Sequence, residues 1–254
     1  MIKGFSIVCI STSDWEQPWG SRQQIMNRLS RHNRILFVEY QMSLFHILKF
    51  PRLGYKIVPG RSRHINNNLT VYRPFLNFPF GYYFRPINLL NQYLLLVQLK
   101  KLIKELKFSR IILWTFEPTA YYLVGKLNKL VSIYHCIDSF KDEKQSALRR
   151  ACIGGFEERL SKTCDLILSS TEGSLIEKSK LNKNTYLIPS AVNEAFFNLE
   201  NDPLVYDKMS KIPEPRIGFV GTIDGRVDIG LVDFIADSLR NCSFLFIGPI
   251  INRS

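Results

Sequence analysis

The sequence has 254 residues, of which 46% are hydrophobic, so it is long enough for one large domain or two smaller ones with cores of their own. Its formal net charge of +12 favours an anionic partner, such as nucleic acid, an anionic membrane face or a phosphorylated ligand. No run of about 18 or more apolar residues occurs, and the apolar N-terminal stretch is too short for a signal peptide, so neither a membrane span nor a leader is predicted.

The cysteines are scattered and form neither a C-x-x-C pair nor a Cys/His spacing typical of a metal site. Cys9, Cys136 and Cys242 lie in or beside apolar runs. We therefore expect buried free thiols in a reducing compartment, with no disulfide framework and no metal centre.

Predicted strands and helices alternate along most of the chain. Apolar runs of strand length occupy residues 5–11, 34–40, 69–73, 110–116, 131–137, 165–170 and 185–188. Helical patterns occupy residues 21–32, 86–107, 118–130, 144–162 and 172–181. This alternation predicts an α/β fold, a Rossmann-like doubly wound parallel sheet with helices on both faces. In such sheets ligands bind beyond the carboxyl ends of the strands.

The loop after the first predicted strand, residues 12–22, is long and carries two tryptophans and one glycine. It does not match G-x-G-x-x-G, so a nicotinamide-type dinucleotide site is disfavoured. Ser21 and Gln24 have the spacing of a capping box and predict the start of the first helix at Ser21.

Residues 41–85 have the least regular pattern, with interleaved aromatic and basic side chains that culminate in NFPFGYYFRP at residues 77–86. Three interpretations stay open: a loop folded over the core, contact with a membrane interface, or binding of single-stranded nucleic acid. Four lysines then gather at the end of the long predicted helix: Lys100, Lys101, Lys104 and Lys107. Cations suit a helix C-terminus by themselves, and they would also suit an anionic membrane surface.

Prolines and weak periodicity predict a linker at residues 191–215. It separates a first domain, residues 1–190, from a second α/β piece, residues 216–254. That piece has only two predicted strands, at 216–223 and 243–247, with one helix between them, which is too little to close a core. We expect it to pack on the first domain or to be the start of a larger domain.

The turn after the strand at residues 216–223 is a candidate anion site. Gly221, Thr222 and Arg226 follow the apolar run, and a helical pattern begins near residue 228. A strand, a glycine turn and a helix aim backbone N–H groups at an anion, and Arg226 adds a guanidinium. Such turns are common in α/β proteins, so a purely structural turn is the alternative.

Seven motifs follow one another over most of the chain: WEQPWGSRQQIMNRLS, ILFVEY, LWTFEP, IYHCIDSF, CDLILSS, IPSAVN and IGFVGTIDGRVD. Their order resembles that of bacterial glycosyltransferases of the GT-B fold, closest to the group 1, family 4-like enzymes of teichuronic-acid or exopolysaccharide biosynthesis. The resemblance implies a GT-B N-terminal domain followed by the start of a second Rossmann-like domain.

The resemblance also implies a function. The protein would move a sugar from a nucleotide-sugar to a lipid-linked or polysaccharide acceptor in cell-wall or exopolysaccharide biosynthesis. It would be cytoplasmic and peripheral on the inner face of the plasma membrane, with an anionic membrane surface as a partner. The first domain would bind the acceptor, and Gly221, Thr222 and Arg226 of the second would hold the donor diphosphate.

The resemblance further places the loop with Trp19, Gly20, Ser21 and Arg22 near the acceptor or a phosphate. No cofactor and no metal is expected, because the GT-B class does not require a bound metal ion.

Polar side chains at predicted strand ends are candidates for catalysis. Glu117, His135 and Asp138 could orient or deprotonate an acceptor hydroxyl. A structural alternative stands beside two of these assignments: a buried, hydrogen-bonded role for His135 and a helix N-cap for Asp138. We expect Glu157 and Glu158 to solvate the surface of a helix.

The chain departs from the family pattern in two places. It has Ser190, Ala191 and Asn193 where the family usually has Asn, Gly and Asp. The paired glutamates of the family's donor domain would lie beyond residue 254. The alternative function is therefore a non-catalytic remnant or acceptor-binding module. Nucleic-acid binding is not expected, because only charge and interleaved aromatics favour it.

Overall fold

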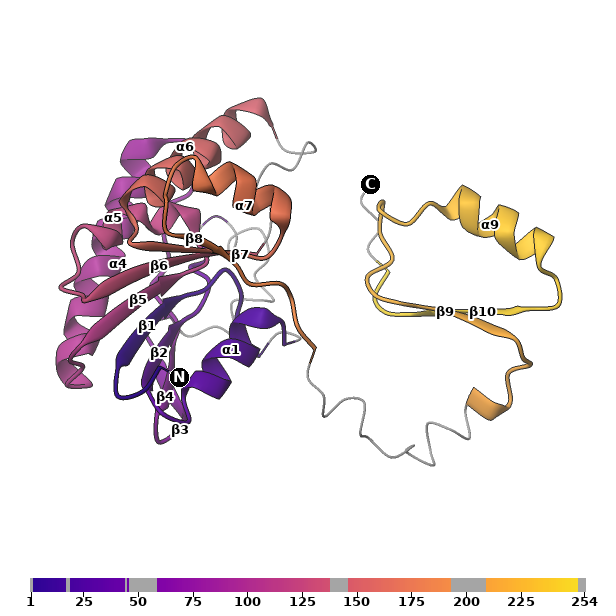
Figure 1. Ribbon diagram of the computed structural model, residues 1–254, viewed down its shortest axis with the longest axis horizontal. Coiled ribbons are helices and arrows are strands. Elements are labelled where there is room, and N and C mark those ends of the chain that lie inside the picture. Colours follow the sequence, from indigo (N-terminus) through magenta and orange to yellow (C-terminus); the bar gives the residue numbers. More distant parts are fainter. Residues whose placement is uncertain are drawn as a thin grey trace. The chain divides into compact units, whose positions relative to one another are not determined.

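The computed structural model describes residues 2–16, 19–43, 45, 59–137, 146–192 and 209–250. The chain divides into two compact units, Met1–Ser190 and Ala191–Ser254 (Figure 1). Asp138, a candidate catalytic residue, lies outside the described residues. Within those residues no helix combines the length and the apolar character needed to cross a membrane.

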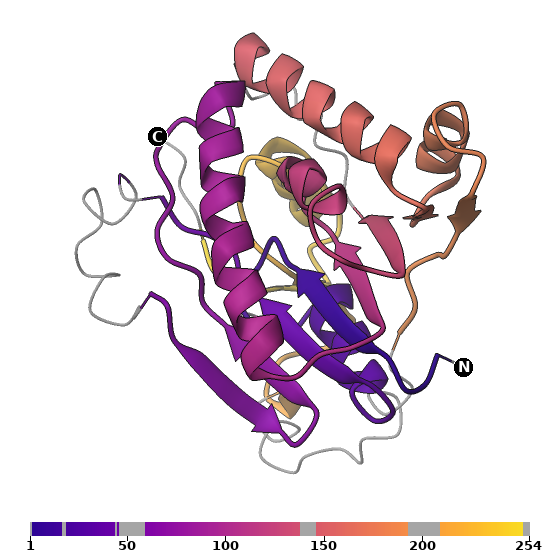
Figure 2. The same ribbon diagram turned by 90° about the vertical axis from the view of Figure 1, so that its left-hand side faces the viewer.

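An eight-stranded sheet forms the middle layer of the first unit (Figures 1 and 2). Its strands are, in spatial order, β3 (Ser62–Asn66), β4 (Leu69–Tyr72), β2 (Arg34–Val38), β1 (Ser6–Ile10), β5 (Ile111–Thr115), β6 (Val131–Cys136), β7 (Leu166–Ser169) and β8 (Thr185–Leu187). All neighbouring strands are parallel except β3 and β4. The winding direction reverses between β1 and β5, and this is the place where open α/β sheets bind ligands.

The sheet is buried on both faces, as the sequence predicts. The helices of this unit are α1 (Ser21–Leu29), α4 (Arg85–Glu105), α5 (Tyr121–Val124), α6 (Ala147–Thr163) and α7 (Glu172–Ser179), with a 3₁₀ helix η1 (Pro118–Ala120). Val8 and Ile10 of β1 pack with α4, α5 and α6 on one face, whereas Ile7 and Cys9 pack toward α1 on the other. Burial on both faces explains why the strands are uninterrupted apolar runs.

Strand β3 is absent from the predicted elements. Its sequence, SRHIN, has no apolar alternation, and four of its five residues are exposed. It exists because it pairs with β4 at the edge of the sheet. Charged side chains on an edge strand hinder pairing with other chains.

Helix α1 starts at Ser21 as predicted, but its capping box lies one residue earlier, and a second predicted helix is too long. Gly20, not Ser21, is the N-cap of α1, and its N–H donates to Gln23 Oε1 at 3.2 Å. The helix predicted at 118–130 shortens to η1 and α5 and stops at Gly125. Glu117 caps η1, because its side chain accepts the Thr119 N–H. Such a local hydrogen bond from a side chain to the backbone competes with a continuous helix.

Glu157 is buried, which corrects the expectation that it solvates a helix. Its Oε1 accepts the Tyr134 hydroxyl at 2.7 Å and pairs with Lys178 Nζ at 2.9 Å. This ion pair joins α6 to α7 inside the unit. Glu158, one residue further, does lie on the exposed face and pairs with Lys162.

The second unit consists of β9 (Arg216–Val220), β10 (Ser243–Ile247) and α9 (Ile229–Ser238), and its two strands are parallel. Asp228 caps α9 by accepting the Leu231 N–H at 3.0 Å. No described residue of α9 is buried, and the side chains of Val220 and Phe234 are 79% and 69% exposed. The local structure is well formed, but the described part of this unit contains no further layer that covers its apolar side chains.

Candidate active site in the first unit

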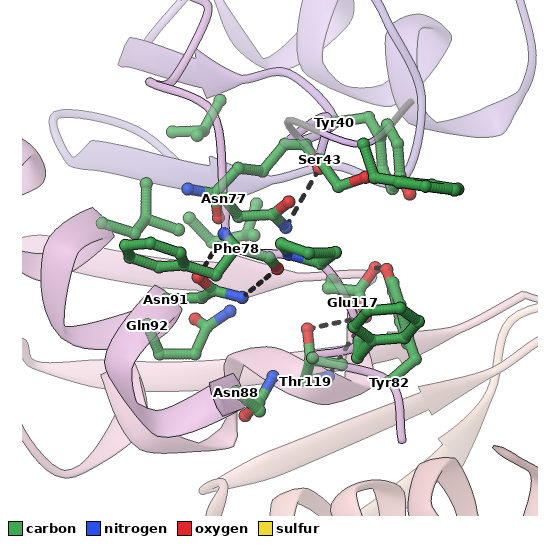
Figure 3. Close-up of a pocket in the computed structure, with 18 of the residues that line it drawn as sticks. Tyr40, Ser43, Asn77, Phe78, Tyr82, Asn88, Asn91, Gln92, Glu117 and Thr119 are labelled. Atoms are coloured by element: carbon green, nitrogen blue, oxygen red, sulfur yellow. Dashed lines mark hydrogen bonds between the residues drawn. The ribbon is translucent and has the colours of Figure 1, made fainter. Parts of the chain in front are cut away.

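A cavity of about 290 Å³ lies beyond the carboxyl ends of β1, β2 and β5 (Figure 3). Ile10 and Ser11 after β1, Val38 to Gln41 after β2, and Glu117 and Thr119 after β5 form one side. Residues 77–83 and the first half of α4 form the other side. The cavity therefore adjoins the point where the winding of the sheet reverses.

Asn91 of α4 fixes the segment that closes the cavity. Its Oδ1 accepts the Phe78 N–H at 2.8 Å, and its Nδ2 donates to the Phe78 carbonyl at 3.0 Å (Figure 3). Gly81 passes close beside the same amide, because a Cβ there would lie 2.9 Å from Asn91 Nδ2. An aromatic segment without helix or strand is thereby held in one conformation.

Two further amides of α4 line the cavity. Asn88 and Gln92 are buried, and among the described residues the side-chain oxygen of neither has a hydrogen-bond partner. A buried amide oxygen without a partner is costly unless a water or ligand donates to it. These two oxygens are thus acceptors available to a ligand with hydroxyl or N–H groups.

Glu117 is the buried carboxyl of the cavity. Oε1 accepts the Thr119 N–H at 3.1 Å and its hydroxyl at 2.9 Å, and Oε2 accepts the Tyr82 hydroxyl at 3.1 Å. Burial raises the pKa of Glu117, and these donors with the charge of Arg22 oppose that rise. Tyr82 also hydrogen-bonds Tyr40, and burial raises the pKa of both phenols. The carboxyl is positioned by three donors and is a candidate proton acceptor.

The rim of the cavity is aromatic. Phe45, Phe78 and Phe80 line it and are each about half exposed, and the rings of Phe45 and Phe80 lie 6.4 Å apart. Among the described lining residues there is no Lys, Arg or His. The other carboxylate, Glu39, is already paired with Arg63 and Arg73. The described lining therefore offers aromatic faces, amides and one buried carboxyl, and no cation.

Ion pairs anchor the start of the loop that contains Trp19. Arg73 pairs with Asp14 at 3.3 Å and with Glu39 at 2.9 Å, and Glu39 also accepts the Trp15 N–H at 2.9 Å. Trp15 packs edge-on against Trp19 with ring centroids 5.1 Å apart. Trp19 is nearly half exposed. The contacts of Arg73 and Glu39 were not visible in the sequence, because their partners are far apart along the chain.

Arg22 lies where several predicted site residues meet. Its guanidinium carbon is 5.6 Å from the centre of the Phe116 ring. Its charge lowers the pKa of His135 and opposes the rise at Glu117. Gly20 and Ser21 precede it at the exposed to half-exposed start of α1. The predicted phosphate or acceptor loop thus brings a cation to the carboxyl ends of β5 and β6.

His135 does not line the cavity. It is buried on the α1 face of the sheet, stacked on Phe116 with ring centroids 5.0 Å apart. Its Nδ1 has no hydrogen-bond partner among the described residues. Burial, with a smaller effect from Arg22, lowers the pKa of His135 to about 4. At neutral pH this imidazole is uncharged, and the structure groups Glu117 with Tyr82 and Thr119 instead.

The predicted donor residues lie together in the second unit. Gly221 follows β9 and Gly248 follows β10, and a Cβ at Gly248 would collide with the Gly221 carbonyl. Arg226 is 74% exposed and forms a two-pronged pair with Asp224, at 2.9 and 3.0 Å. Thr222 is half-buried in the same turn. A diphosphate at this turn would meet the negative charge of Asp224, which accepts from two nitrogens of Arg226.

Three cavity amides, Asn88, Asn91 and Gln92, were not predicted as site residues. They occupy positions that a helical pattern assigns to the buried face of α4. The sequence did contain a signal for these site residues: polar amides on a helix face that is otherwise apolar and buried. Among the described residues, no three His, Cys, Asp or Glu side chains gather to hold a metal ion.

No protein-family model and no curated protein matches the sequence. Solved structures do match. They include an Escherichia coli protein titled trehalose-6-phosphate bound with UDP-2-fluoro glucose, at a TM-score of 0.62 and 12% identity over 97% of this chain. The α,α-trehalose-phosphate synthase (UDP-forming) of Burkholderia xenovorans, in complex with glucose-6-phosphate, matches at a TM-score of 0.56 and 10% identity over 98% of this chain. The α,α-trehalose 6-phosphate synthase of Burkholderia multivorans matches at a TM-score of 0.56 and 12% identity over 98% of this chain.

This likeness confirms the predicted fold class, a Rossmann-like α/β architecture shared with GT-B enzymes. At 10 to 12% identity it establishes the fold alone. The chain spans 64 to 66% of the length of these three neighbours.

Proposed function

We propose that the protein is a nucleotide-sugar-dependent glycosyltransferase whose first unit binds the acceptor. The observation that carries the proposal is the cavity beyond β1, β2 and β5, which combines a buried carboxyl, unpaired amide oxygens and aromatic rings. Its volume is near the lower end of the range for small-molecule sites. The fold likeness and the motif order support the same reaction class.

The lining fits an uncharged, hydroxyl-rich group such as one sugar ring. Aromatic side chains offer flat apolar faces, and Asn88 and Gln92 offer oxygen acceptors for hydroxyl groups. A sugar phosphate would need cations, and the described lining contains none. We therefore infer that the acceptor presents an unphosphorylated sugar here, unlike the glucose-6-phosphate bound to the Burkholderia xenovorans neighbour.

In this proposal Glu117 takes the proton of the acceptor hydroxyl as its oxygen forms a bond to the anomeric carbon of the donor. The bond from that carbon to the diphosphate breaks, and the diphosphate leaves. Gly221, Thr222 and Arg226 of the second unit bind the diphosphate. Electrostatic stabilisation of a leaving group is commonly the largest part of catalysis.

The finer assignment rests on the sequence resemblance and the charge. The acceptor is proposed to be lipid-linked or a polysaccharide, in cell-wall or exopolysaccharide biosynthesis at the cytoplasmic face of the plasma membrane. The net charge of +12 favours such an anionic surface. A second candidate is an acceptor-binding module without turnover. It is favoured by the ion pair of Arg226 with Asp224, whose negative charge opposes an anionic diphosphate at this turn.

Calorimetric titration of the 254-residue protein with a methyl glycoside and with glucose-6-phosphate tests the acceptor site. The neutral glycoside should bind roughly tenfold or more tightly than the phosphate, because the described lining has no cation. Asn88→Ala with Gln92→Ala should weaken glycoside binding, because two acceptors for its hydroxyl groups are lost, and Asn67→Ala, at an exposed turn, should not. Equal or tighter binding of glucose-6-phosphate would contradict the proposal.

Transfer from a labelled nucleotide-sugar to a lipid-linked acceptor tests catalysis. Glu117→Gln should lower transfer by roughly 100-fold or more, while the exposed Glu158→Gln should retain it. Because the carboxylate is the active form and burial raises the pKa of Glu117, activity should fall on acidification at a higher pH than for an ordinary glutamate. Glycoside binding without any transfer would instead establish the binding module.

A further inference from the structure

Helix α4 has apolar side chains on the face that points away from the sheet. Leu90, Tyr93, Leu94 and Val97 are 46%, 52%, 36% and 51% exposed. Their spacing of three and four residues aligns them in one stripe along the helix. In Figure 2 α4 lies at the front of the first unit, and no other described helix or strand of that unit covers it.

The opposite face of α4 carries the cavity amides, so the usual arrangement of polar side chains outward and apolar ones inward is partly inverted. A contiguous apolar surface of this kind on a protein marks an interaction site. Exposed apolar side chains that occur singly need no such explanation.

The stripe continues into the aromatic rim of the cavity. Phe84, the N-cap of α4, is half exposed, and its N–H donates to the Phe80 carbonyl at 3.0 Å. Phe80 in turn lies beside Phe45, and both line the cavity. Exposed aromatic side chains thus join the N-terminal end of α4 to the mouth of the cavity.

Lysine side chains follow the apolar stripe toward the C-terminal end of α4. Lys101 and Lys104 occupy the positions that follow Val97 on the same side of the helix, and Lys100 and Lys107 flank them. Lys101 has one partner, Glu105, at 3.8 Å, and its side chain is 77% exposed. The last turns of α4 thus present positive charge beside an apolar surface.

We propose that the stripe on α4 and the aromatic rim dock on an anionic lipid surface. Apolar and aromatic side chains would enter the boundary between headgroups and acyl chains, and the lysines would contact anionic headgroups. The net charge of +12 opposes the stacking of two copies of the chain and favours an anionic occupant. The inference rests on the proposed function only for the lipid-linked acceptor, which would reach the cavity from the bilayer.

The test is co-sedimentation of the full chain with vesicles of phosphatidylcholine, with and without phosphatidylglycerol. Binding is expected to the anionic vesicles. Leu90→Glu with Val97→Glu should weaken it roughly tenfold or more. Leu130→Glu with Ile176→Glu, two residues 60% and 61% exposed, is the matched control and should bind as the parent does. Lys101→Glu with Lys104→Glu should weaken binding to the anionic vesicles by a similar factor.

The proposal is overturned if the parent does not bind anionic vesicles, or if the α4 variant binds as tightly as the control. It is also overturned if size-exclusion chromatography shows that Leu90→Glu with Val97→Glu converts a dimer to a monomer, because a second copy would then cover the stripe. Glycoside binding in the same variants separates the two proposals: failed docking with intact sugar binding refutes only this one.

Discussion

The two units differ in how far they bury their apolar side chains. In the first, the apolar residues of β1 alternate between two buried clusters, one on each face of the sheet. In the second, β9 and α9 are just as apolar, yet Val220 and Phe234 remain largely exposed. Strands and helices form in both units, so the elements of the second unit form without a covering layer, whereas burial requires further layers.

The polar contacts differ in the same way. Glu39 pairs with Arg63 and Arg73, and Glu157 with Lys178, over long distances along the chain. The second unit has short-range contacts, such as the pair of Arg226 with Asp224. Long-range contacts fix a tertiary structure, and short-range ones stabilise only the segment that contains them.

The largest expected effect is on independent folding. A protein of residues 1–190 should unfold in one cooperative urea transition, because it contains both buried clusters. Residues 191–254 alone should show no sharp transition by circular dichroism, since two strands and a helix rarely hold together. All three tryptophans lie in the first unit, so their fluorescence reports on that unit alone. A sharp transition of the isolated second unit would contradict the proposed difference between the two units.

Replacing a buried charge should matter more than replacing an exposed one. Lys178→Met leaves Glu157 buried without its cation and should destabilise the first unit by about 3–5 kcal/mol, measured by urea titration of tryptophan fluorescence. Arg226→Met in the second unit should leave amide exchange in α9 unchanged. Adding Glu157→Leu with Tyr134→Phe to Lys178→Met removes the buried carboxylate together with the hydroxyl that it accepts, and should recover much of the loss. A failure to do so would mean that the pair is not the cause.

The smallest of the three expected effects is on the pH dependence of the stability of the first unit. His135 has a pKa of about 4 in the folded protein against 6.5 when unfolded, so the unfolded state binds protons first on acidification. Its contribution to stability is complete above pH 6.5 and decreases toward pH 4, by up to about 3 kcal/mol. His135→Phe should remove this part of the pH dependence of tryptophan-detected unfolding, and His32→Gln, at an exposed turn, should not. An identical pH profile in His135→Phe would contradict the assignment.

The sequence predicted the strands that are buried on both faces, because their apolar runs are continuous. It missed β3, whose residues are polar and depend on pairing with β4. It placed the N-cap of α1 at Ser21, because the rule favours serine, whereas Gln23 supports the N–H of Gly20. Errors therefore fall where a tertiary partner or a single hydrogen bond decides between neighbouring residues.

The sequence predicted only part of the candidate site, because tertiary partners decide the rest. Glu117 follows an apolar strand, so its place at the carboxyl edge of the sheet follows from the fold class. Its partner Tyr82 and the amides Asn88 and Gln92 come from a segment whose conformation depends on Asn91 binding Phe78. Glu157 was assigned to a solvated surface because its cation, Lys178, is on another helix.

The two faces of α4 have a thermodynamic consequence. One rigid helix carries Asn88 and Gln92 toward the cavity and Leu90 and Val97 toward the proposed lipid surface. Adsorption to a bilayer and occupancy of the cavity are then linked equilibria. Any factor by which adsorption strengthens sugar binding must equal the factor by which sugar strengthens adsorption. With a factor above one, a protein with an empty cavity leaves the bilayer more readily than one with its acceptor bound, and residence at the membrane then reports the supply of acceptor.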